Sequence, residues 1–251
     1  MMDEHAIEVF FDVQSDLPRQ GPGDASSTRK ALKLCIGLPS DANVLDIGCG
    51  PGAQTIVIAE ALPEAHITAI DTHEPYLKEL RDRSKSAGCE TRISTQKHDM
   101  SLLPFKPASF DLIWAEGSAY IMGVSQALTT WKPLVKNGGY IALTELVWLT
   151  QNPPTEATEF FKVEYPAMTT PDNIVSIICA AGYQALDHFT LPDHAWWDDY
   201  YTPLSTRLLS LEKKYAGEEI AMPIIELTKQ ELAIRKQFGA SYGYEFFVAK
   251  K

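Results

Sequence analysis

The stretch LDIGCGPGAQT, residues 45–55, decides the fold of this chain. It begins as an apolar strand-like run, passes through Gly48, Gly50 and Gly52, and continues into a helical pattern over residues 53–62. A glycine-rich turn between a strand and a helix lets backbone N–H groups approach a ligand closely. We therefore expect the first strand, turn and helix of an α/β domain, with a binding site at the turn.

Strand-like runs and helical patterns alternate along most of the chain, which favours βαβ units and a doubly wound, Rossmann-like parallel sheet. The predicted strands are residues 43–47, 67–70, 91–96, 110–114, 140–146 and 183–189. The predicted helices are residues 53–62, 74–87, 125–135, 171–180, 204–215 and 218–238, and a further helix is expected to begin near Ala25. The final run, SYGYEFFVAK, follows a helical insertion, so we expect a last strand that lies antiparallel at or near the sheet edge.

Composition favours a single domain over residues 1–251 that acts on a small molecule. The formal net charge of -11 repels nucleic acid and anionic lipid, whose binding needs clustered Lys and Arg. The acidic start MMDEHAIEVFFDV does not resemble a signal peptide, and no apolar run reaches the roughly 20 residues of a membrane span. We expect a cytoplasmic protein, either a monomer or a homodimer. The sequence has no C-x-x-C pair and no zinc-ligand spacing, so no metal site is predicted.

The glycine loop itself fits two cofactors. Gly48-x-Gly50-x-x-Ala53 matches the dinucleotide fingerprint, whereas the spacing Gly48-x-Gly50-x-Gly52 resembles the loop of S-adenosylmethionine (SAM) methyltransferases. Asp46 would repel a pyrophosphate but favours the sulfonium and ammonium of SAM, directly or through water. Pro51 removes one N–H donor that a phosphate could have used.

Acidic residues follow the next two strands. Asp71 ends the second strand and is expected to bind ribose hydroxyls, a role that both cofactors allow. Asp99 follows the third strand, where a carboxylate can accept a hydrogen bond from an adenine amino group.

The complete set of motifs resembles the class I SAM-dependent methyltransferases, in particular the small-molecule branch that includes the ubiquinone-type C-methyltransferases. The resemblance covers about residues 40–150 and rests on six ordered motifs. They are VLDIGCGPG (44–52), AID (69–71), HDM (98–100), LPF (103–105), SFDLIWAEG (109–117) and LVKNGGYIALTE (134–145).

This resemblance implies SAM as the cofactor, S-adenosylhomocysteine as the product and a seven-stranded sheet with an antiparallel last strand. It also implies that Asp46 and the glycines line the methionine part, that Met100 lies beside the adenine ring and that Glu116 and Gly117 line the methyl-donor cleft. The expected cofactor-binding set is Arg19, Gln20, Gly21, Asp46, Gly48, Cys49, Gly50, Gly52, Asp71, Thr72, Asp99, Met100, Glu116 and Gly117.

Two segments outside the motifs are candidates for covering the site. Residues 1–30 include the loop RQGPG, which is either a surface linker or a lid whose Arg19 or Gln20 meets the cofactor carboxylate. Residues 191–240 form a helical insert with the dense aromatic stretch LPDHAWWDDYYTPL. Its aromatic side chains either fill a core between helices or form a substrate wall. The expected substrate-binding residues are Trp148, Trp196, Trp197, Tyr200 and Tyr201.

The expected chemistry is SN2 transfer of a methyl group to a small acceptor, for which the enzyme mainly supplies proximity and alignment. An acceptor that must lose a proton also needs a base, and the candidates are Glu116, Glu145 and His194, with Tyr120 as a hydrogen-bond partner. Two alternatives stay open at this point: a SAM-binding sensor or accessory protein without transferase activity, and an NAD-dependent oxidoreductase.

Overall fold

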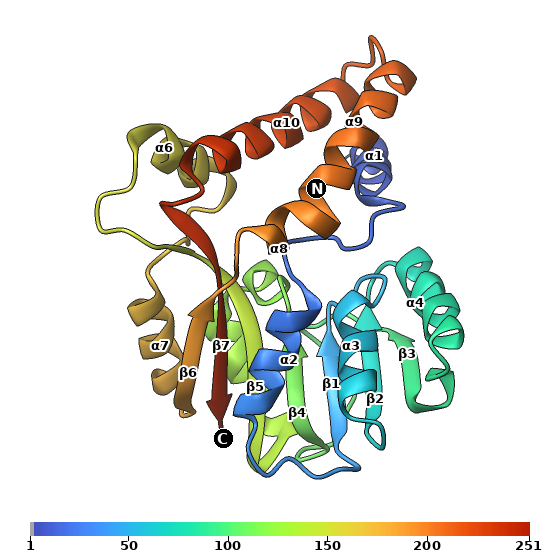
Figure 1. The fold of residues 1–251 in the computed structure, drawn as a ribbon, viewed down its shortest axis with the longest axis vertical. Helices are drawn as coiled ribbons and strands as arrows, with labels where there is room; N and C mark the ends of the chain where they lie inside the picture. The colour runs from blue at the N-terminus through green and yellow to red at the C-terminus, as the bar shows by residue number, and fades with distance from the viewer. Residues whose placement is uncertain (1–2) are drawn as a thin grey trace.

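The computed structural model describes residues 3–251 and contains one seven-stranded sheet (Figure 1). The strand order is β3-β2-β1-β4-β5-β7-β6, and β7 runs antiparallel to both of its neighbours while the other pairs are parallel. The strands are β1 (Asn43–Ile47), β2 (His66–Asp71), β3 (Ile93–Lys97), β4 (Phe110–Ala115), β5 (Val135–Trp148), β6 (Gln184–Thr190) and β7 (Tyr242–Lys250). This confirms the predicted doubly wound α/β fold with an antiparallel last strand.

The central strands are apolar because both faces of the sheet are covered. Every residue of β4 is buried, as are four of the five residues of β1. Helices α2 (Ala25–Leu34), α3 (Ala53–Ala61) and α4 (Glu74–Ser86) pack on one face, and α5 (Val124–Trp131) and α7 (Pro171–Ala180) pack on the other. The chain order reverses between β1 and β4, and this switch point is where ligands bind in such sheets.

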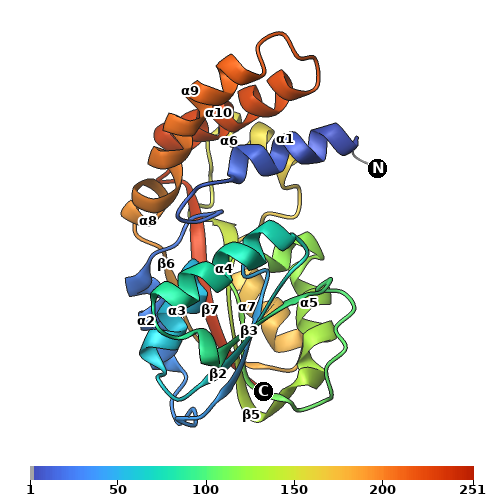
Figure 2. The same ribbon diagram turned by 90° about the vertical axis from the view of Figure 1, so that its right-hand side faces the viewer.

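A helical cap lies beyond the carboxyl ends of the parallel strands, separate from the sheet layers (Figure 2). It consists of α1 (Glu4–Gln14), α6 (Thr155–Glu164), α8 (His194–Trp196), α9 (Thr202–Lys214) and α10 (Ala221–Phe238). Although α1 begins the chain, it packs against α9 and α10, and Arg207 donates to the Asp12 carbonyl (2.7 Å) and carboxylate (2.7 Å). An N-terminal helix and helices from the second half of the sequence therefore build one cap.

The structure differs from the sequence expectation most clearly at β5. We predicted a helix over residues 125–135 and a strand over 140–146, whereas α5 ends at Trp131 and β5 begins at Val135. Val135 pairs with Phe110, and the register then shifts before Leu112 pairs with Tyr140. The Gly138 backbone, with φ at +77°, allows the strand to continue through the irregular turn that we took as a break.

Two further helices were absent from the prediction. The apolar spacing of Val9 and Val13 in α1 and of Ala157, Phe160 and Phe161 in α6 matches one face of a helix, and all five side chains are buried. No helix within residues 3–251 combines the length and the apolar character that crossing a bilayer requires.

Candidate functional site

The glycine turn occupies the switch point between β1 and α3. Gly48, Gly50 and Gly52 all have positive φ, at +69°, +53° and +86°, which L-residues adopt only with strain. A Cβ on Gly48 would lie 2.5 Å from the Ser118 Cβ, and one on Gly52 would lie 2.1 Å from the Leu80 Cδ1. Conformation and close packing together therefore require glycine here.

Two acidic side chains hold this turn in place. Asp71 Oδ2 accepts a hydrogen bond from the Gly50 N–H (3.0 Å), and its Oδ1 accepts one from the His73 N–H (2.9 Å). Asp46 is fully buried below the turn and accepts hydrogen bonds from Thr55 Oγ1 (2.5 Å) and Gln54 Nε2 (3.3 Å).

Burial raises the pKa of Asp46 to about 7, although the Thr55 and Gln54 hydrogen bonds act against this rise. Asp71 lines the cavity above the turn, whereas Asp46 lies behind the wall. The charge of Asp46 can therefore reach a ligand only across the loop.

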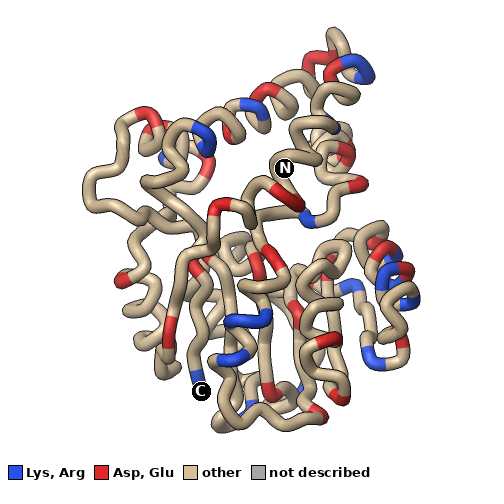
Figure 3. The backbone as a smooth tube through the Cα atoms, in the orientation of Figure 1, with Lys and Arg blue, Asp and Glu red and all other residues tan. Residues whose placement is uncertain are grey.

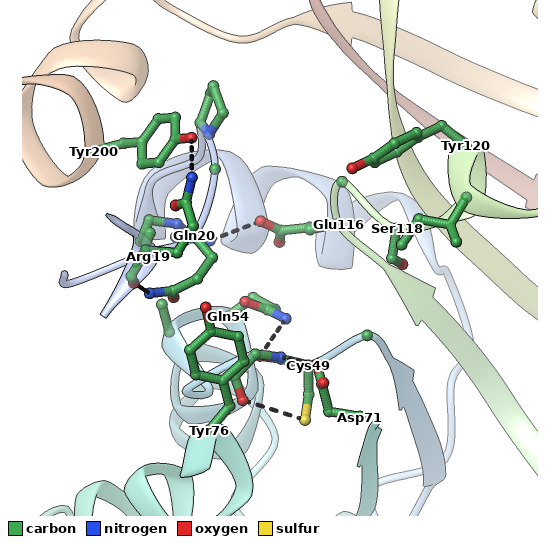
Figure 4. Close-up of a pocket in the computed structure, with 18 of the residues that line it drawn as sticks. Arg19, Gln20, Cys49, Gln54, Asp71, Tyr76, Glu116, Ser118, Tyr120 and Tyr200 are labelled. Atoms are coloured by element: carbon green, nitrogen blue, oxygen red, sulfur yellow. Dashed lines mark hydrogen bonds and ion pairs between the residues drawn. The ribbon is translucent and has the colours of Figure 1, made fainter. Parts of the chain in front are cut away.

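The linker between α1 and α2, residues 15–24, lies over the glycine turn (Figure 4). The Arg83 guanidinium donates to the Pro18 carbonyl (2.8 Å), and the Gly23 N–H donates to the Ala195 carbonyl (2.9 Å). These contacts tie the linker to α4 on one side and to α8 on the other. Gln20 Oε1 lies 3.8 Å from the position of a Cβ on Gly50, so the linker reaches the loop itself.

A buried ion pair joins the linker to the end of β4. Arg19 donates to Glu116 Oε2 at 2.7 Å, and the two side chains are only 7% and 6% exposed. Glu116 also accepts hydrogen bonds from Thr28 Oγ1 (2.9 Å) and Trp114 Nε1 (3.0 Å). With three donors on its two oxygens, Glu116 anchors the linker.

A cavity of about 430 Å³ lies between the glycine turn, the linker and the cap, within the size range of small-molecule sites. Many predicted cofactor-binding residues share its wall. They are Arg19, Gln20, Gly21, Gly48, Cys49, Gly50, Asp71, Thr72, Met100, Glu116 and Gly117. In the described part of the chain, Asp46, Gly52 and Asp99 lie outside the wall. Asp99 is exposed, and its Oδ1 accepts hydrogen bonds from the N–H and hydroxyl of Ser101 (both 2.7 Å).

The far end of the cavity is aromatic. Of the predicted substrate residues, Trp196, Tyr200 and Tyr201 form part of the wall, and Tyr120 faces it from the loop after β4 (Figure 4). A π-helical turn over Trp197–Tyr201 carries both tyrosines toward the cavity.

The remaining predicted residues of this end lie elsewhere. Trp148 packs behind the wall against Phe161 and Tyr242, with ring centroids 5.7 and 6.2 Å away. Trp197 contacts Tyr201 from outside, with centroids 5.4 Å apart. The His194 side chain is 56% exposed, beside Asp24.

Several wall residues were not predicted from the sequence. They include Gln14, Tyr76, Phe161, Glu231, Tyr242 and Tyr244. The alternation of Tyr242 and Tyr244 in SYGYEFFVAK places both on one face of a strand, so that signal was present. Glu231 lies in the middle of α10, and nothing local distinguishes it from the other glutamates of that helix.

Ionisable groups at the cap end of the cavity have raised pKa values. Burial raises the pKa of Glu231, whereas the hydrogen bond from the Tyr201 hydroxyl to its Oε1 (2.7 Å) lowers it. The pKa of Tyr120 is raised, first by burial and then by the negative charges of Glu231 and Glu145. Glu145 lies behind the wall, and burial raises its pKa to about 7. Among residues 3–251 there is no cluster of His, Cys, Asp or Glu suited to a metal ion.

Comparisons with known proteins agree with this geometry. The sequence profile of the family described as "Methyltransferase domain" matches residues 44–139. The 27-O-demethylrifamycin SV methyltransferase of Amycolatopsis mediterranei is 31% identical over 49% of this chain and 46% of its own length. The demethylmenaquinone methyltransferase of Lactiplantibacillus plantarum is 30% identical over 47% of this chain and 50% of its own. The chain thus spans about half the length of these relatives.

Among solved structures, the SAM-dependent methyltransferase from Geobacter sulfurreducens in complex with S-adenosyl-L-homocysteine shares the fold. Its TM-score is 0.80 at 16% identity, covering 96% of this chain and 97% of that one. Residues 44–139 thus match the methyltransferase-domain family, and the fold is that of a SAM-dependent methyltransferase, as the six motifs predict.

Proposed function

We propose that this protein transfers a methyl group from SAM to a small-molecule acceptor bound under the helical cap. The observation that carries the proposal is the single cavity wall that joins the glycine turn and Asp71 to the aromatic residues of the cap. One end of this wall has the features of a SAM site, and the other end leaves space for an acceptor.

The residues at the glycine end fit SAM. Asp71 presents a carboxylate at the end of β2, where it can accept hydrogen bonds from ribose hydroxyls, and Met100 offers an apolar surface for adenine. Gln20 Oε1 is buried over the loop without a protein donor among residues 3–251, so it can accept a hydrogen bond from the ammonium of SAM. Arg19 can bind the carboxylate of SAM, whereas Asp99, which the sequence predicts as an adenine ligand, lies outside the cavity wall.

When bound, SAM supplies an electrophilic methyl group on a sulfonium. The acceptor atom attacks the methyl carbon as the carbon–sulfur bond breaks, which leaves S-adenosylhomocysteine and releases one proton when the acceptor is protonated. The protein's task is to align the acceptor and exclude water. The linker and the cap exclude water, because they cover the cavity from α4 to α8. We propose that the Tyr120 hydroxyl orients the acceptor.

The charge distribution supports a small acceptor over a polyanion. Figure 3 shows Lys and Arg positions dispersed among Asp and Glu positions rather than gathered on one face. The cavity wall carries Asp71, Glu116 and Glu231 against a single Arg19 among its described Lys and Arg residues. A neutral or cationic acceptor therefore suits this wall better than an anionic one.

The experiment is incubation with SAM carrying an isotopically labelled methyl group and a metabolite extract, followed by mass spectrometry of the products. We expect labelled small molecules that are absent with the Asp71→Ala variant. S-adenosylhomocysteine binding without any labelled product from broad acceptor pools would contradict methyl transfer.

A further inference from the structure

The cap end of the cavity contains one carboxylate that is not balanced by a cation. Glu231 projects from α10 into the wall, and Tyr201 donates its hydroxyl to one of its oxygens. Within the described residues, no Lys, Arg or His forms an ion pair with Glu231. Glu231 is half-buried, and a carboxylate withdrawn from water without a counter-charge is costly, so a bound positive charge would relieve that cost.

Neither Arg19 nor Arg235 forms an ion pair with Glu231, because each is paired with another carboxylate. Arg19 is paired with Glu116. Arg235 lies behind the wall, stacked 3.9 Å from the centre of the Trp196 ring, and donates to Asp193 (2.8 Å) and to the Tyr242 carbonyl (2.9 Å).

Aromatic rings surround the same end of the cavity. This end is lined by Tyr120, Tyr200 and Tyr244. Burial is the largest cause that raises the pKa of each phenol, and the charge of Glu231 also contributes. Tyrosine and tryptophan faces attract cations through their quadrupoles, and quaternary ammonium groups are bound in such aromatic enclosures. Ring faces and a carboxylate therefore favour the same kind of ligand.

Two residues of the wall each carry a buried polar atom without a protein partner among residues 3–251. Trp196 Nε1 and the Tyr242 hydroxyl have no hydrogen-bond partner among residues 3–251, and their side chains are only 2% and 1% exposed. Buried donors are normally satisfied, so a ligand oxygen or nitrogen that accepts from them would complete this wall.

We propose that the acceptor is a small molecule bearing a protonated amine or a quaternary ammonium group, and that Glu231 anchors this group among the aromatic rings. The proposal rests on the proposed function, since it names the class of molecule that the acceptor end binds. It assigns Glu231 as a binding residue for the cation and does not require the charged nitrogen to be the methylated atom.

The test uses matched pairs of probes whose members differ in charge but hardly in shape. One pair is choline and 3,3-dimethylbutan-1-ol, and the other is 2-phenylethylamine and 2-phenylethanol. Binding of each is measured by NMR titration of the full chain saturated with S-adenosylhomocysteine. We expect the cationic member of at least one pair to bind about tenfold more tightly than its neutral partner.

Glu231→Gln should abolish this preference while leaving the affinity for S-adenosylhomocysteine unchanged, which also reports a folded protein. Glu226→Gln is the matched control, because Glu226 lies on the same helix but is exposed and paired with Lys229. This control should retain the preference.

Equal affinity within both pairs, no binding of any probe, or a preference that survives in Glu231→Gln would overturn the proposal. A chain that binds S-adenosylhomocysteine but does not discriminate between the probes refutes only the assignment of the acceptor. A chain that does not bind S-adenosylhomocysteine refutes the proposed function as well.

Discussion

The two ends of the cavity are built in different ways. The glycine end comes from short strand-to-helix connections, in which Gly48 and Gly50 follow β1, Asp71 ends β2, and the Gly50 N–H donates to the Asp71 carboxylate. The cap end comes from side chains far apart in the chain, such as Gln14, Tyr200 and Glu231. The first end is fixed by local backbone geometry, whereas the second depends on how separate helices pack. Substitutions at the two ends should therefore have different consequences.

The largest effect is expected where the glycine end has no spare room. Gly52→Ala combines a left-handed backbone with a Cβ 2.1 Å from the buried Leu80, so we expect a loss of about 3 kcal/mol in the free energy of unfolding. Gly88→Ala is the matched control, because Gly88 has φ at +68° but no atom within 4 Å of its Cβ, and it should lose only about 1 kcal/mol. Urea unfolding of both variants measures the difference. Equal losses would show that backbone strain alone, and not close packing, requires glycine at the turn.

The next effect concerns cofactor affinity. Asp71→Asn removes a charged acceptor from the wall and should weaken S-adenosylhomocysteine binding by about 2 kcal/mol, or about thirtyfold, in calorimetry. Asp99→Asn alters an exposed carboxylate outside the wall, so its effect should stay within about twofold. A larger loss at Asp99 than at Asp71 would reverse this order and would support direct adenine binding by Asp99.

A pH effect should distinguish the buried carboxylate behind the cap end. The pKa of Glu145 is about 7 in the folded protein against 4.5 as its ordinary value, so the folded state holds the proton more tightly than the unfolded chain. This stabilisation is complete below pH 4.5 and is lost as the pH rises through about 7. Glu145→Gln should therefore lose less unfolding free energy than the wild type between pH 5 and 8, by about 1–2 kcal/mol. The free energy of unfolding of each protein is measured by urea unfolding across this pH range. An equal change with pH in the two proteins would contradict this assignment.

The smallest effect is expected from a single hydroxyl at the cap end. Tyr242→Phe removes a buried hydroxyl that has no protein partner among residues 3–251, so it should raise the free energy of unfolding by up to about 1 kcal/mol. Tyr201→Phe removes the hydroxyl that donates to Glu231, and it should lower that free energy by about 1 kcal/mol. Thermal or urea unfolding in the absence of ligands gives both values. A loss at Tyr242 would mean that its hydroxyl is already satisfied in the free protein.

The same contrast explains what the sequence could predict. The sheet, its antiparallel last strand and the positions of Asp71 and Met100 follow from motifs in which each residue lies a fixed distance from the end of a strand. Glu231 could not be selected in this way, because its position in the wall depends on the rotation of α10 over the cavity. Trp197 and Trp196 are neighbours with the same composition signal, yet only Trp196 faces the cavity, since the π-helical turn that follows sets their directions.

Glu116 shows a second limit of reasoning from the sequence. Its place after β4 predicts a position in the cleft, and it does line the cavity. Two of its three partners, Arg19 and Thr28, lie 97 and 88 residues earlier in the chain, where no local sequence pattern could reveal them. A residue predicted as a candidate base is also the point where the linker is attached.

The most direct test of the central claim, that the glycine end is a SAM site, is a calorimetric titration of the full chain with S-adenosylhomocysteine and, separately, with NAD. We predict saturable binding of S-adenosylhomocysteine to one site per chain and no heat of binding with NAD. Binding of NAD without binding of S-adenosylhomocysteine would contradict it.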